Sequence, residues 1–474
     1  MAMGKRDSQR QDRFWLVTAD IPQAPGHPFY RRLNQLLAQY GFDPFVEDLC
    51  RPFYHEQLGR PSVPPGVYFR MLLIGYFEGI DSERGIAWRC GDSLTLREFL
   101  AYELTQSTPE HSSLSRIRER IDLQTHREVF GWVLKMLSER GLLKGKSLGV
   151  DATSLEANAA MRSIVRRDTG EGYNGFLTSL AQASGIATPT REDLARIDRS
   201  RKNKASNKDW QSPHDPDAKI TKMKDGRTHL AHKAEHAVDL QSGAIVAVTL
   251  QPADRGDTSS LPVTLEQAQE NLREAAGETE SNESSTGPSR AAGAAAPDEH
   301  RIVEVAADKG YHSNETCRQL AQEHIRSYLS EPDNGRRNWK GKGRERQAVY
   351  ANRRRIRGER GKRLLRKRGE LLERPFAHCY ETGGMRRVHL RGHPNILKRL
   401  LVHVAGFNLA LLMRSMYGIG KPRRLQDGLP AAVSALFCGI LALLHALRGR
   451  RTDPLPYRAL LAPLPIPTAP RRGC

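Results

Sequence analysis

The chain has 474 residues, and its 74 Lys and Arg against 54 Asp and Glu give a formal net charge of +20 and a pI of about 9.9. Its 38% hydrophobic and 27% charged residues are typical of folded globular proteins and exclude a collagen-like or wholly disordered chain. A positive surplus of this size favours a polyanionic partner, either nucleic acid or an anionic membrane. The six cysteines form no closely spaced pair, which argues against a disulfide framework or zinc ribbon and fits a reducing cytoplasm.

The N-terminal part of the chain is predicted to be helical. Residues 30–40 and 66–78 carry apolar side chains at intervals of three and four residues, the spacing of one helix face. Shorter helices are expected in residues 81–87 and 112–120, each after a turn-forming sequence. These patterns predict an all-α N-terminal domain over residues 14–140.

The expected helix at 112–120 has a composition that suits DNA. It carries Arg116 and Arg118 on one surface, where the side chains of a helix in a DNA groove would contact bases and phosphates. An ordinary solvated helix in a bundle explains the same residues equally well, so both interpretations stay open.

From residue 144 the pattern changes to short apolar strands. Residues 146–150 form an apolar run that ends at Asp151, and residues 301–307 form another that ends at Asp308. The further elements expected here are a β-hairpin, a helix and a last strand, at residues 229–251, 260–272 and 325–329. The sequence therefore predicts an α/β domain with a mixed sheet.

Polar segments interrupt this second domain, which we place at residues 144–415. Residues 160–228 are predicted to form a loop or a helical insertion, and residues 277–299 a flexible one. Residues 416–474 are expected to form a helical and Pro-rich tail. Its apolar run at 429–447 is long enough to span a membrane, but Pro, Gly and His interrupt it, which favours a buried or partner-facing helix.

The densest charge lies in residues 336–374, which hold 17 Lys and Arg against 4 Glu. Such a run is usually a solvated tail. Here Leu364, Leu365 and Leu372 add helical apolar spacing, which predicts a packed helix with one basic face. Trp339 and Tyr350 lie among the charges, where they would either pack or stack on exposed bases.

Three acids are candidates for a metal centre. Asp151 and Asp308 each follow an apolar strand, and Glu373 lies inside the basic helix. Carboxylate oxygens are the ligands that Mg²⁺ prefers, and two such ions can activate an attacking oxygen and stabilise a leaving oxygen at phosphorus. Spacing alone does not distinguish this trio from the many other acids of the chain.

The sequences around these acids resemble a known family. Residues 148–153, 307–311 (Ala-Asp-Lys-Gly-Tyr) and 371–376 (Leu-Leu-Glu-Arg-Pro-Phe) are similar to the three acidic motifs of bacterial insertion-sequence DDE transposases. Residues 233–239 and 381–392 resemble supporting parts of the same domain, and the similarity extends over residues 14 to 415. The resemblance implies an RNase H-like catalytic core behind the all-α domain.

The resemblance also implies roles for individual residues. Asp151, Asp308 and Glu373 would be the catalytic, metal-binding triad for Mg²⁺ or Mn²⁺, with two ions and no ATP. Many relatives surround the glutamate with a Tyr, an Arg and a Lys at fixed spacing. Counted from Glu373, the residues at these positions are Arg366, Gly369 and Tyr380; counted from Glu370, they are Arg363, Arg366 and Ala377. The signature is degraded in both registers, and the Glu-Arg-Pro-Phe context favours Glu373.

Further basic residues are candidates for contacts with DNA phosphates. Together with the two arginines of the 112–120 helix, the set is Arg116, Arg118, Arg366, Arg368, Arg374, Arg386, Arg387 and Lys398. Other residues near the motifs have simpler interpretations. His236, His312 and His378 lack metal-ligand spacing, and Asp254 and Asp257 resemble turn and helix-cap residues, with an indirect role at the site as the alternative.

The function implied is that of a DNA transposase. It would bind the terminal inverted repeats of its own element, cleave them and join the 3′-OH ends to target double-stranded DNA, as a homodimer or larger assembly. It is expected in the cytoplasm, associated with the nucleoid and not with a membrane. The alternatives are a catalytically inactive DNA-binding protein derived from such an enzyme, and a basic structural protein associated with RNA.

Overall fold

The computed structural model describes residues 28–55, 59, 61–201, 206–223, 225–277, 301–333, 335 and 337–422. All of them belong to one compact unit, which spans residues 1–422. The expectations for the apolar segment at 429–447, for the rest of the tail beyond Pro422 and for the insertion beyond Gly277 lie outside the described residues.

The N-terminal part is helical, as predicted. Its elements are α1 (Pro28–Gln39), α2 (Phe42–Cys50), η2 (Arg51–Phe53), α3 (Pro65–Glu78), α4 (Glu83–Asp92), α5 (Leu94–Phe99), α6 (His111–Arg120) and α7 (Leu123–Glu139). Helix α3 is buried from Gly66 to Phe77, so it is the central helix of this part. Side chains of Ser82 and Asp122 accept backbone N–H groups in the first turns of α4 and α7 and fix where these helices begin.

The second part is built on a mixed sheet. Its strands are β1 (Ser147–Glu156), β4 (Lys219–Lys222), β5 (Thr228–Asp239), β6 (Ile245–Pro252), β7 (Glu304–Ala307) and β8 (Arg326–Leu329). The order is β4-β5-β1-β7-β8, with β6 also paired to β5. Strand β5 is antiparallel to β1, β4 and β6, whereas β1, β7 and β8 run parallel. The predicted hairpin, the other strands and the mixed α/β fold are confirmed, but the first strand does not end at Asp151: β1 continues through it to Glu156, paired with β5 along its length.

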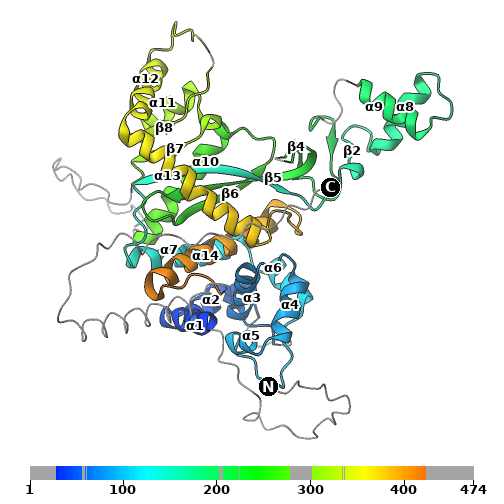
Figure 1. Cartoon of the computed structure of the whole chain (residues 1–474). Helices are drawn as coiled ribbons and strands as arrows, with labels where there is room; N and C mark the ends of the chain where they lie inside the picture. The colour runs from blue at the N-terminus through cyan, green and yellow to red at the C-terminus, as the bar shows by residue number, and fades with distance from the viewer. Residues whose placement is uncertain are drawn as a thin grey trace, which may run out of the picture. The chain divides into compact units, whose positions relative to one another are not determined.

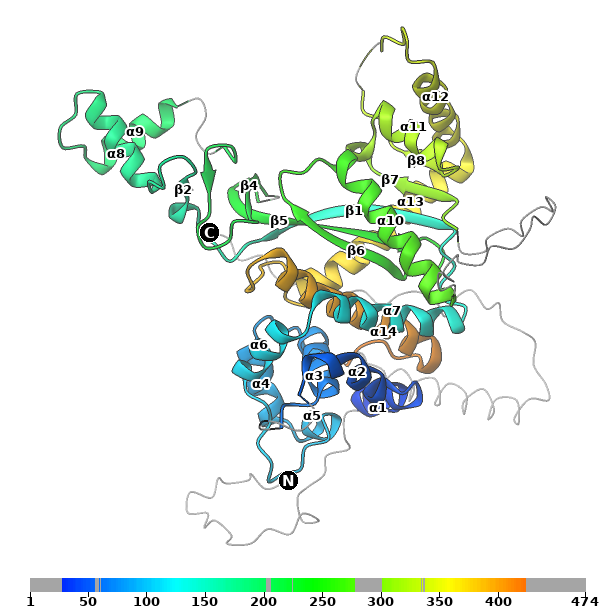
Figure 2. The ribbon, with the colours of Figure 1, turned by 180° about the vertical axis from the view of Figure 1, so that it is seen from behind.

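Two helices cover opposite faces of this sheet. His236 of β5 lies against α13 (Glu359–Phe376) and the π-helix η5 (Ala377–Thr382), with its ring 5.1 Å from that of Phe376. The next side chain, Glu235, accepts a hydrogen bond from Ser260 of α10 (Asp257–Ala276). Because successive side chains of a strand point to opposite faces, α13 and α10 lie on different sides of the sheet (Figures 1 and 2).

The remaining elements complete the two layers. They are η4 (Lys309–Tyr311), α11 (Asn314–Gln322), α12 (Gly343–Arg357) and α14 (His393–Tyr417). Helix α14 contacts α3, α7 and β6, so it shares a core with the N-terminal helices. Asn408 fixes it to the sheet by bonding both the N–H and the C=O of Ile245. In the described part of the chain, α14 alone is long and apolar enough to cross a membrane, and its apolar window is 83% buried in this core.

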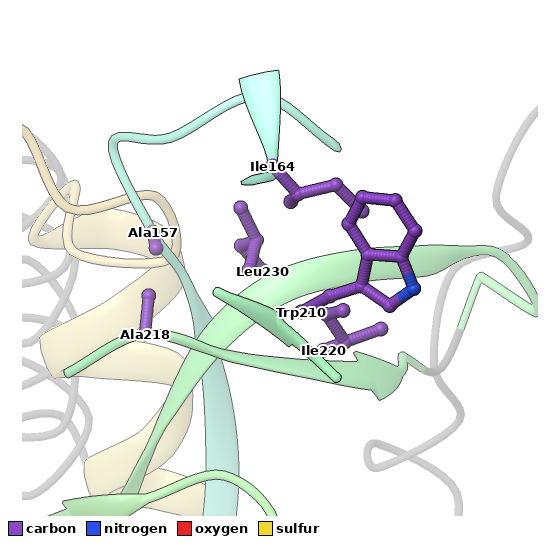
Figure 3. Packing of buried hydrophobic residues seen from close by; sticks show 6 residues of the cluster. All are labelled: Ala157, Ile164, Trp210, Ala218, Ile220 and Leu230. Carbon is purple, nitrogen blue, oxygen red and sulfur yellow. The ribbon is translucent and has the colours of Figure 1, made fainter. Parts of the chain in front are cut away.

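The insertion at residues 160–228 has a small core of its own. It contains η3 (Met161–Ser163), β2 (Val165–Arg166), α8 (Tyr173–Ala183), α9 (Arg191–Ser200) and β3 (Trp210–Gln211). Trp210 lies among Ile164, Ile220 and Leu230 (Figure 3) and is 1% exposed. Where the structure describes it, this segment is therefore not only a loop: it has two helices, as the helical alternative expected, but also the strands β2 and β3, and β4 joins the main sheet.

Replacing Trp210 with Ala is expected to destabilise the insertion by about 3–5 kcal/mol, the usual cost of removing a buried Trp side chain. The indole ring contacts Tyr173 and Phe176, at centroid distances of 4.9 and 5.4 Å. Hydrogen exchange should become faster in α8 and β3 while β1 and β7 stay protected. Trp88, which is 76% exposed, provides the matched control, because Trp88→Ala should leave exchange in the insertion unchanged.

Candidate active site

Asp151 and Asp308 lie where the parallel pairing of β1 and β7 ends. The two strands pair Leu148 with Val305 and Gly149 with Ala306. Continuing this register by two residues sets Asp151 beside Asp308, on strands that lie about 4.8 Å apart. The structure therefore brings together two of the three acids predicted from the sequence.

The turn after β7 fixes the direction of the Asp308 side chain. Its Oδ1 accepts a hydrogen bond of 2.9 Å from the N–H of Gly310 and caps the short helix η4. A Cβ on Gly310 would collide with Asp257 Oδ2 and lie 3.2 Å from Asp308 Oδ1. Glycine is thus required at the third position of the Asp-Lys-Gly-Tyr motif because two carboxylates approach it closely.

Helix α13 is held against β1 beside Asp151. The position of a Cβ on Gly149 is 2.6 Å from Leu372 Cδ1 and 3.3 Å from Arg368 Cγ. This close approach brings Arg368 Nη2 to 2.8 Å from Asp151 Oδ2. The guanidinium group, which was expected to contact DNA, therefore balances the charge of an acid at the site.

Two glycines give opposite predictions for Ala substitution. Gly149→Ala is expected to destabilise the fold by about 1–3 kcal/mol, because its Cβ meets Leu372 and Leu240. Gly369 lies inside α13 with no atom within 4 Å of a Cβ, so Gly369→Ala should stabilise the fold by about 0.5–1 kcal/mol. Chemical denaturation of both variants tests the packing of α13 on β1. Equal midpoints for the two would contradict it.

The third acid is less tightly placed than the first two. Glu373 and Glu370 are both exposed, and Glu370 forms an ion pair with Arg374. Leu372 marks the side of α13 that faces the sheet. At about 100° per residue, Glu373 is rotated by about 100° from Leu372 and Glu370 by about 160°, so Glu373 points less far from the sheet.

The donor set at the two strand ends suits a hard divalent cation. Mg²⁺ in enzymes is often held by one or two carboxylates, with water and substrate phosphate in the remaining positions. Asp151 and Asp308 supply such a pair, with Asp257 close to Asp308. Within the described residues no group of three His, Cys, Asp or Glu side chains is arranged to hold a metal ion, so a third ligand from α13 requires a change in the Glu373 side chain.

An ion pair between the buried Lys233 and the partly exposed Asp257 adjoins Asp308. The sequence offered an indirect role at the site for Asp257 but did not indicate its partner. Lys233 of β5 donates to Asp257 Oδ1 and, at 3.1 Å each, to Arg255 O and Ser260 Oγ. Lys233 is 6% exposed. Asp257 is the first residue of α10, but Gly256 is its cap and no side chain caps the helix, so the helix-cap interpretation of Asp257 is wrong. Its oxygens contact Lys233 and the Gly310 turn instead.

The negative charge around this turn perturbs two neighbouring groups. Burial raises the pKa of Tyr311, and the nearby carboxylates of Glu235, Asp257, Asp151 and Asp308 raise it further. Burial also raises the pKa of Glu235 to about 7. Within the described part of the chain the Tyr311 hydroxyl has no hydrogen-bond partner, although the side chain is buried near these acids. The four carboxylates therefore share one electrostatic environment.

The position of the signature Lys is occupied by a core residue. Tyr380 is fully buried, and its hydroxyl is hydrogen bonded to Nε2 of His236. Pro375 lies in the last turn of α13, and the chain continues as the π-helix η5, which carries Tyr380 into the core. Tyr380 is thus unable to contact a phosphate in this structure.

Of the eight basic residues proposed to contact DNA, Arg368 is paired with Asp151, and five others have side chains at or near the surface. Arg366 and Arg374 are exposed on α13, and Arg116 is exposed on α6. Arg386 bonds Thr153 Oγ1 and Ser154 O of β1, whereas the exposed Arg387 lies 3.8 Å from Glu156. These residues remain candidates for phosphate contacts.

The structure places Arg118 and Lys398 differently from the expectation. Arg118 is 9% exposed and forms an ion pair with Glu83. Lys398 is 7% exposed, and its Nζ donates to Arg118 O and Ile121 O, where it satisfies carbonyls at the end of α6. Arg118 therefore joins α6 to α4, and Lys398 joins α14 to the end of α6. We correct the assignment of both as contacts with DNA.

The basic segment forms two consecutive helices, α12 and α13. Their exposed sides carry many of the basic residues of this segment, whereas Arg353 and Arg355 are partly buried and bond Glu331 and Ser327. The basic residues of the two helices that are exposed and form no ion pair within the described residues are Arg344, Arg346, Arg354, Arg357, Arg363, Arg366 and Lys367. Trp339 and Tyr350 pack against each other at 6.1 Å, with Arg353 4.9 Å from the Tyr350 ring. Tyr350 is 43% exposed, so the aromatic pair packs and still presents one ring at the basic surface.

The three histidines near the motifs have other partners, as expected. His236 contacts Tyr380, His312 lies 3.8 Å from Cys317 Sγ, and His378 lies beside Lys421. Burial lowers the pKa of each. The three histidine rings therefore lie at separate places in the fold, each beside a different partner, and do not converge on one site.

Comparisons with known proteins identify the family. A transposase domain family (DUF772) matches residues 18–120, and the transposase DDE domain family matches residues 207–409. Asp308 and Glu373 lie within the second match, and Asp151 lies between the two. Comparisons with curated proteins and with solved structures find no match. Both matched domains and the mixed sheet between helices agree: the chain belongs to the insertion-sequence transposases of the DDE superfamily, with an RNase H-like core.

Proposed function

We propose that this transposase binds the terminal inverted repeats of its insertion sequence, cleaves the DNA there and transfers the 3′-OH ends to target DNA. DDE transposases act on DNA and generally use divalent metal ions. The observation that carries the proposal is the pair of aspartates on adjacent parallel strands, Asp151 and Asp308, beside the basic helix α13.

Asp151, Asp308 and Glu373 are the proposed ligands for Mg²⁺ or Mn²⁺. A divalent cation held there supplies Lewis-acid stabilisation of phosphate oxygens and makes an attacking water more acidic. Carboxylates held close together repel one another and need a compensating positive charge to remain ionised. Arg368 supplies that charge to Asp151 when no cation does.

Arg368 then has a second role. If Asp151 held a cation, Nη2 of Arg368 would lose its carboxylate partner and be available to a DNA phosphate, while Nε would still be anchored to Val150 O of β1. Exposed Arg366 and Arg374 flank it on α13 and neutralise the backbone further along the strand. The N-terminal helical domain is proposed to recognise the inverted repeat, in a dimer or larger synaptic complex.

Cleavage of labelled DNA that carries the ends of the element tests this function. With Mg²⁺ the purified protein should cut at the element boundary, and it should fail on fragments with scrambled ends or with EDTA. Specific binding without cleavage in Mg²⁺ or Mn²⁺ would instead identify an inactive DNA-binding derivative. Equal binding to repeat, scrambled and RNA probes would contradict the proposal.

A further inference from the structure

The ion pair between Lys233 and Asp257 has no place in the triad, yet it lies directly behind Asp308. Lys233 comes from the central strand β5 and Asp257 from the start of α10, so the pair joins two elements at the turn that carries Asp308. Asp257 uses Oδ1 for Lys233 and presents Oδ2 to Gly310. Both the pair and Asp308 therefore contact the same turn.

The ammonium group of Lys233 is held in place by hydrogen bonds. Its three N–H groups reach Asp257 Oδ1, Arg255 O and Ser260 Oγ, which satisfies the ammonium group completely. The Lys233 side chain is 7% exposed and that of Asp257 is 35% exposed, so water screens the ammonium group weakly and the carboxylate in part. The buried Glu235 shares the Ser260 hydroxyl with Lys233. The local arrangement thus holds one full positive charge opposite one full negative charge.

The balance of these charges matters to a cation at Asp308. With both partners present, the pair adds no net charge at the turn. Without the ammonium group, Asp257 would add one negative charge beside Asp308 and attract a divalent cation. Without the Asp257 carboxylate, the ammonium group would add one positive charge and repel it. The two losses therefore have opposite electrostatic effects on one site.

A second observation indicates that the turn is built around charge. Tyr311, the last residue of the motif, is 1% exposed, its hydroxyl has no partner among the described residues, and the carboxylates of Glu235, Asp257, Asp151 and Asp308 lie near enough to raise its pKa. A buried polar group without a partner is costly, so native sites rarely keep one unless a ligand or solvent occupies the space.

We infer that Lys233 and Asp257 are positioning residues that set the charge at the Asp308 turn and thereby the affinity of the transposase for its divalent cation. This inference rests on the proposed function, because it takes Asp308 as a cation ligand. Neither residue contacts the reacting phosphate, and both act through Asp308 and its turn.

Titration of the full-length protein with Mn²⁺, in the absence of DNA, tests the inference by electron paramagnetic resonance of free Mn²⁺. Asp257→Asn should weaken binding about tenfold, the usual size of effects from groups behind metal ligands. Lys233→Met should tighten binding by a similar factor. The double variant should return to within about threefold of the wild type, because it restores the balance of charge.

The conservative pair provides the control. Lys233→Arg and Asp257→Glu keep the charges and should bind Mn²⁺ within about threefold of the wild type. Lys233→Gln replaces the Met variant if the latter does not fold. A merely structural pair would weaken binding in both single variants, with parallel losses of thermal stability, and this result would overturn the inference.

The Asp308→Asn variant distinguishes a failure of the proposed function from a failure of the charge-setting role of Lys233 and Asp257. If this variant binds Mn²⁺ as the wild type does, Asp308 is no ligand and the proposed function fails together with the inference. If it loses Mn²⁺ binding while Lys233→Met and Asp257→Asn shift affinity in the same direction, the proposed function stands and only the charge-setting role is overturned.

Discussion

Replacing Asp308 with Asn is expected to reduce Mg²⁺-dependent cleavage of the element's ends by about 10³-fold or more, since metal-assisted charge stabilisation contributes several kcal/mol to such reactions. Asn has nearly the same volume, and its amide oxygen can still accept the Gly310 N–H, so the turn is preserved. Binding of end DNA should stay within about threefold of the wild type, because phosphate contacts come from basic residues elsewhere.

Asp333→Asn is the matched control for this variant. Asp333 lies beyond β8, is exposed and contacts only the N–H of Gly335 at 3.5 Å among the interactions described. Its substitution makes the same change in charge and should leave cleavage unchanged. Full cleavage by Asp308→Asn, measured as nicked product over a single turnover, would remove Asp308 from the active site.

Acid is expected to destabilise the fold steeply below pH 6.5. Burial lowers the pKa of His126 to about 4 and of His236 to about 3, and it lowers that of His403 as well. In the unfolded chain these histidines bind protons with a pKa near 6.5, whereas in the folded protein they bind them only at lower pH. Their contribution to the free energy of unfolding is therefore fully present above pH 6.5 and is lost as the pH falls.

The expected slope follows from the number of groups. Each buried histidine contributes about 1.4 kcal/mol per pH unit between its unfolded and folded pKa, so three contribute about 4 kcal/mol. Glu235, whose pKa is raised to about 7, acts in the opposite sense down to its unfolded pKa, because the folded protein takes up its proton first. Burial also lowers the pKa of the less deeply buried His312, His378 and His393, which act in the same sense as the three counted here. A net loss of about 3 kcal/mol per unit or more is therefore expected between pH 6 and 5.

Urea denaturation at pH 7, 6 and 5 measures this slope. His236→Gln cannot titrate but retains a donor and an acceptor near Tyr380, and it should reduce the slope by about 1.4 kcal/mol per unit. A free energy of unfolding that stays constant from pH 7 to 5 would show that these rings are not neutral in the folded state.

The catalytic core was predictable because its signals are local. A central strand buried on both faces is an uninterrupted apolar run, so the positions of β1 and β7, and of the acids after their paired segments, were visible in the sequence. The insertion was less predictable. The residues of its core are spread from 157 to 230 in the sequence, so no local hydrophobic pattern predicts that they pack together. Trp210 is the largest side chain among its buried residues.

The details of the site depend on contacts between distant segments. Asp257 is a usual helix-start residue by sequence, and only the fold brings it to Gly310. Arg118 and Lys398 resemble surface cations, but Arg118 is paired with Glu83 of α4, and Lys398 of α14 is bonded to carbonyls at the end of α6. Tyr380 enters the core through the π-helix that follows Pro375, a backbone irregularity without a sequence period. Amino-acid composition and local sequence patterns do not predict contacts between residues that lie far apart in the chain.

The central claim is that Asp151 and Asp308 together hold the catalytic cation. Anomalous diffraction from crystals of the transposase grown with end DNA and Mn²⁺ tests it most directly. The account predicts an anomalous peak within about 2.3 Å of a carboxylate oxygen from each of the two aspartates, a usual distance for such a cation. A Mn²⁺ peak held by other residues, with Asp151 still bound to Arg368, would contradict it.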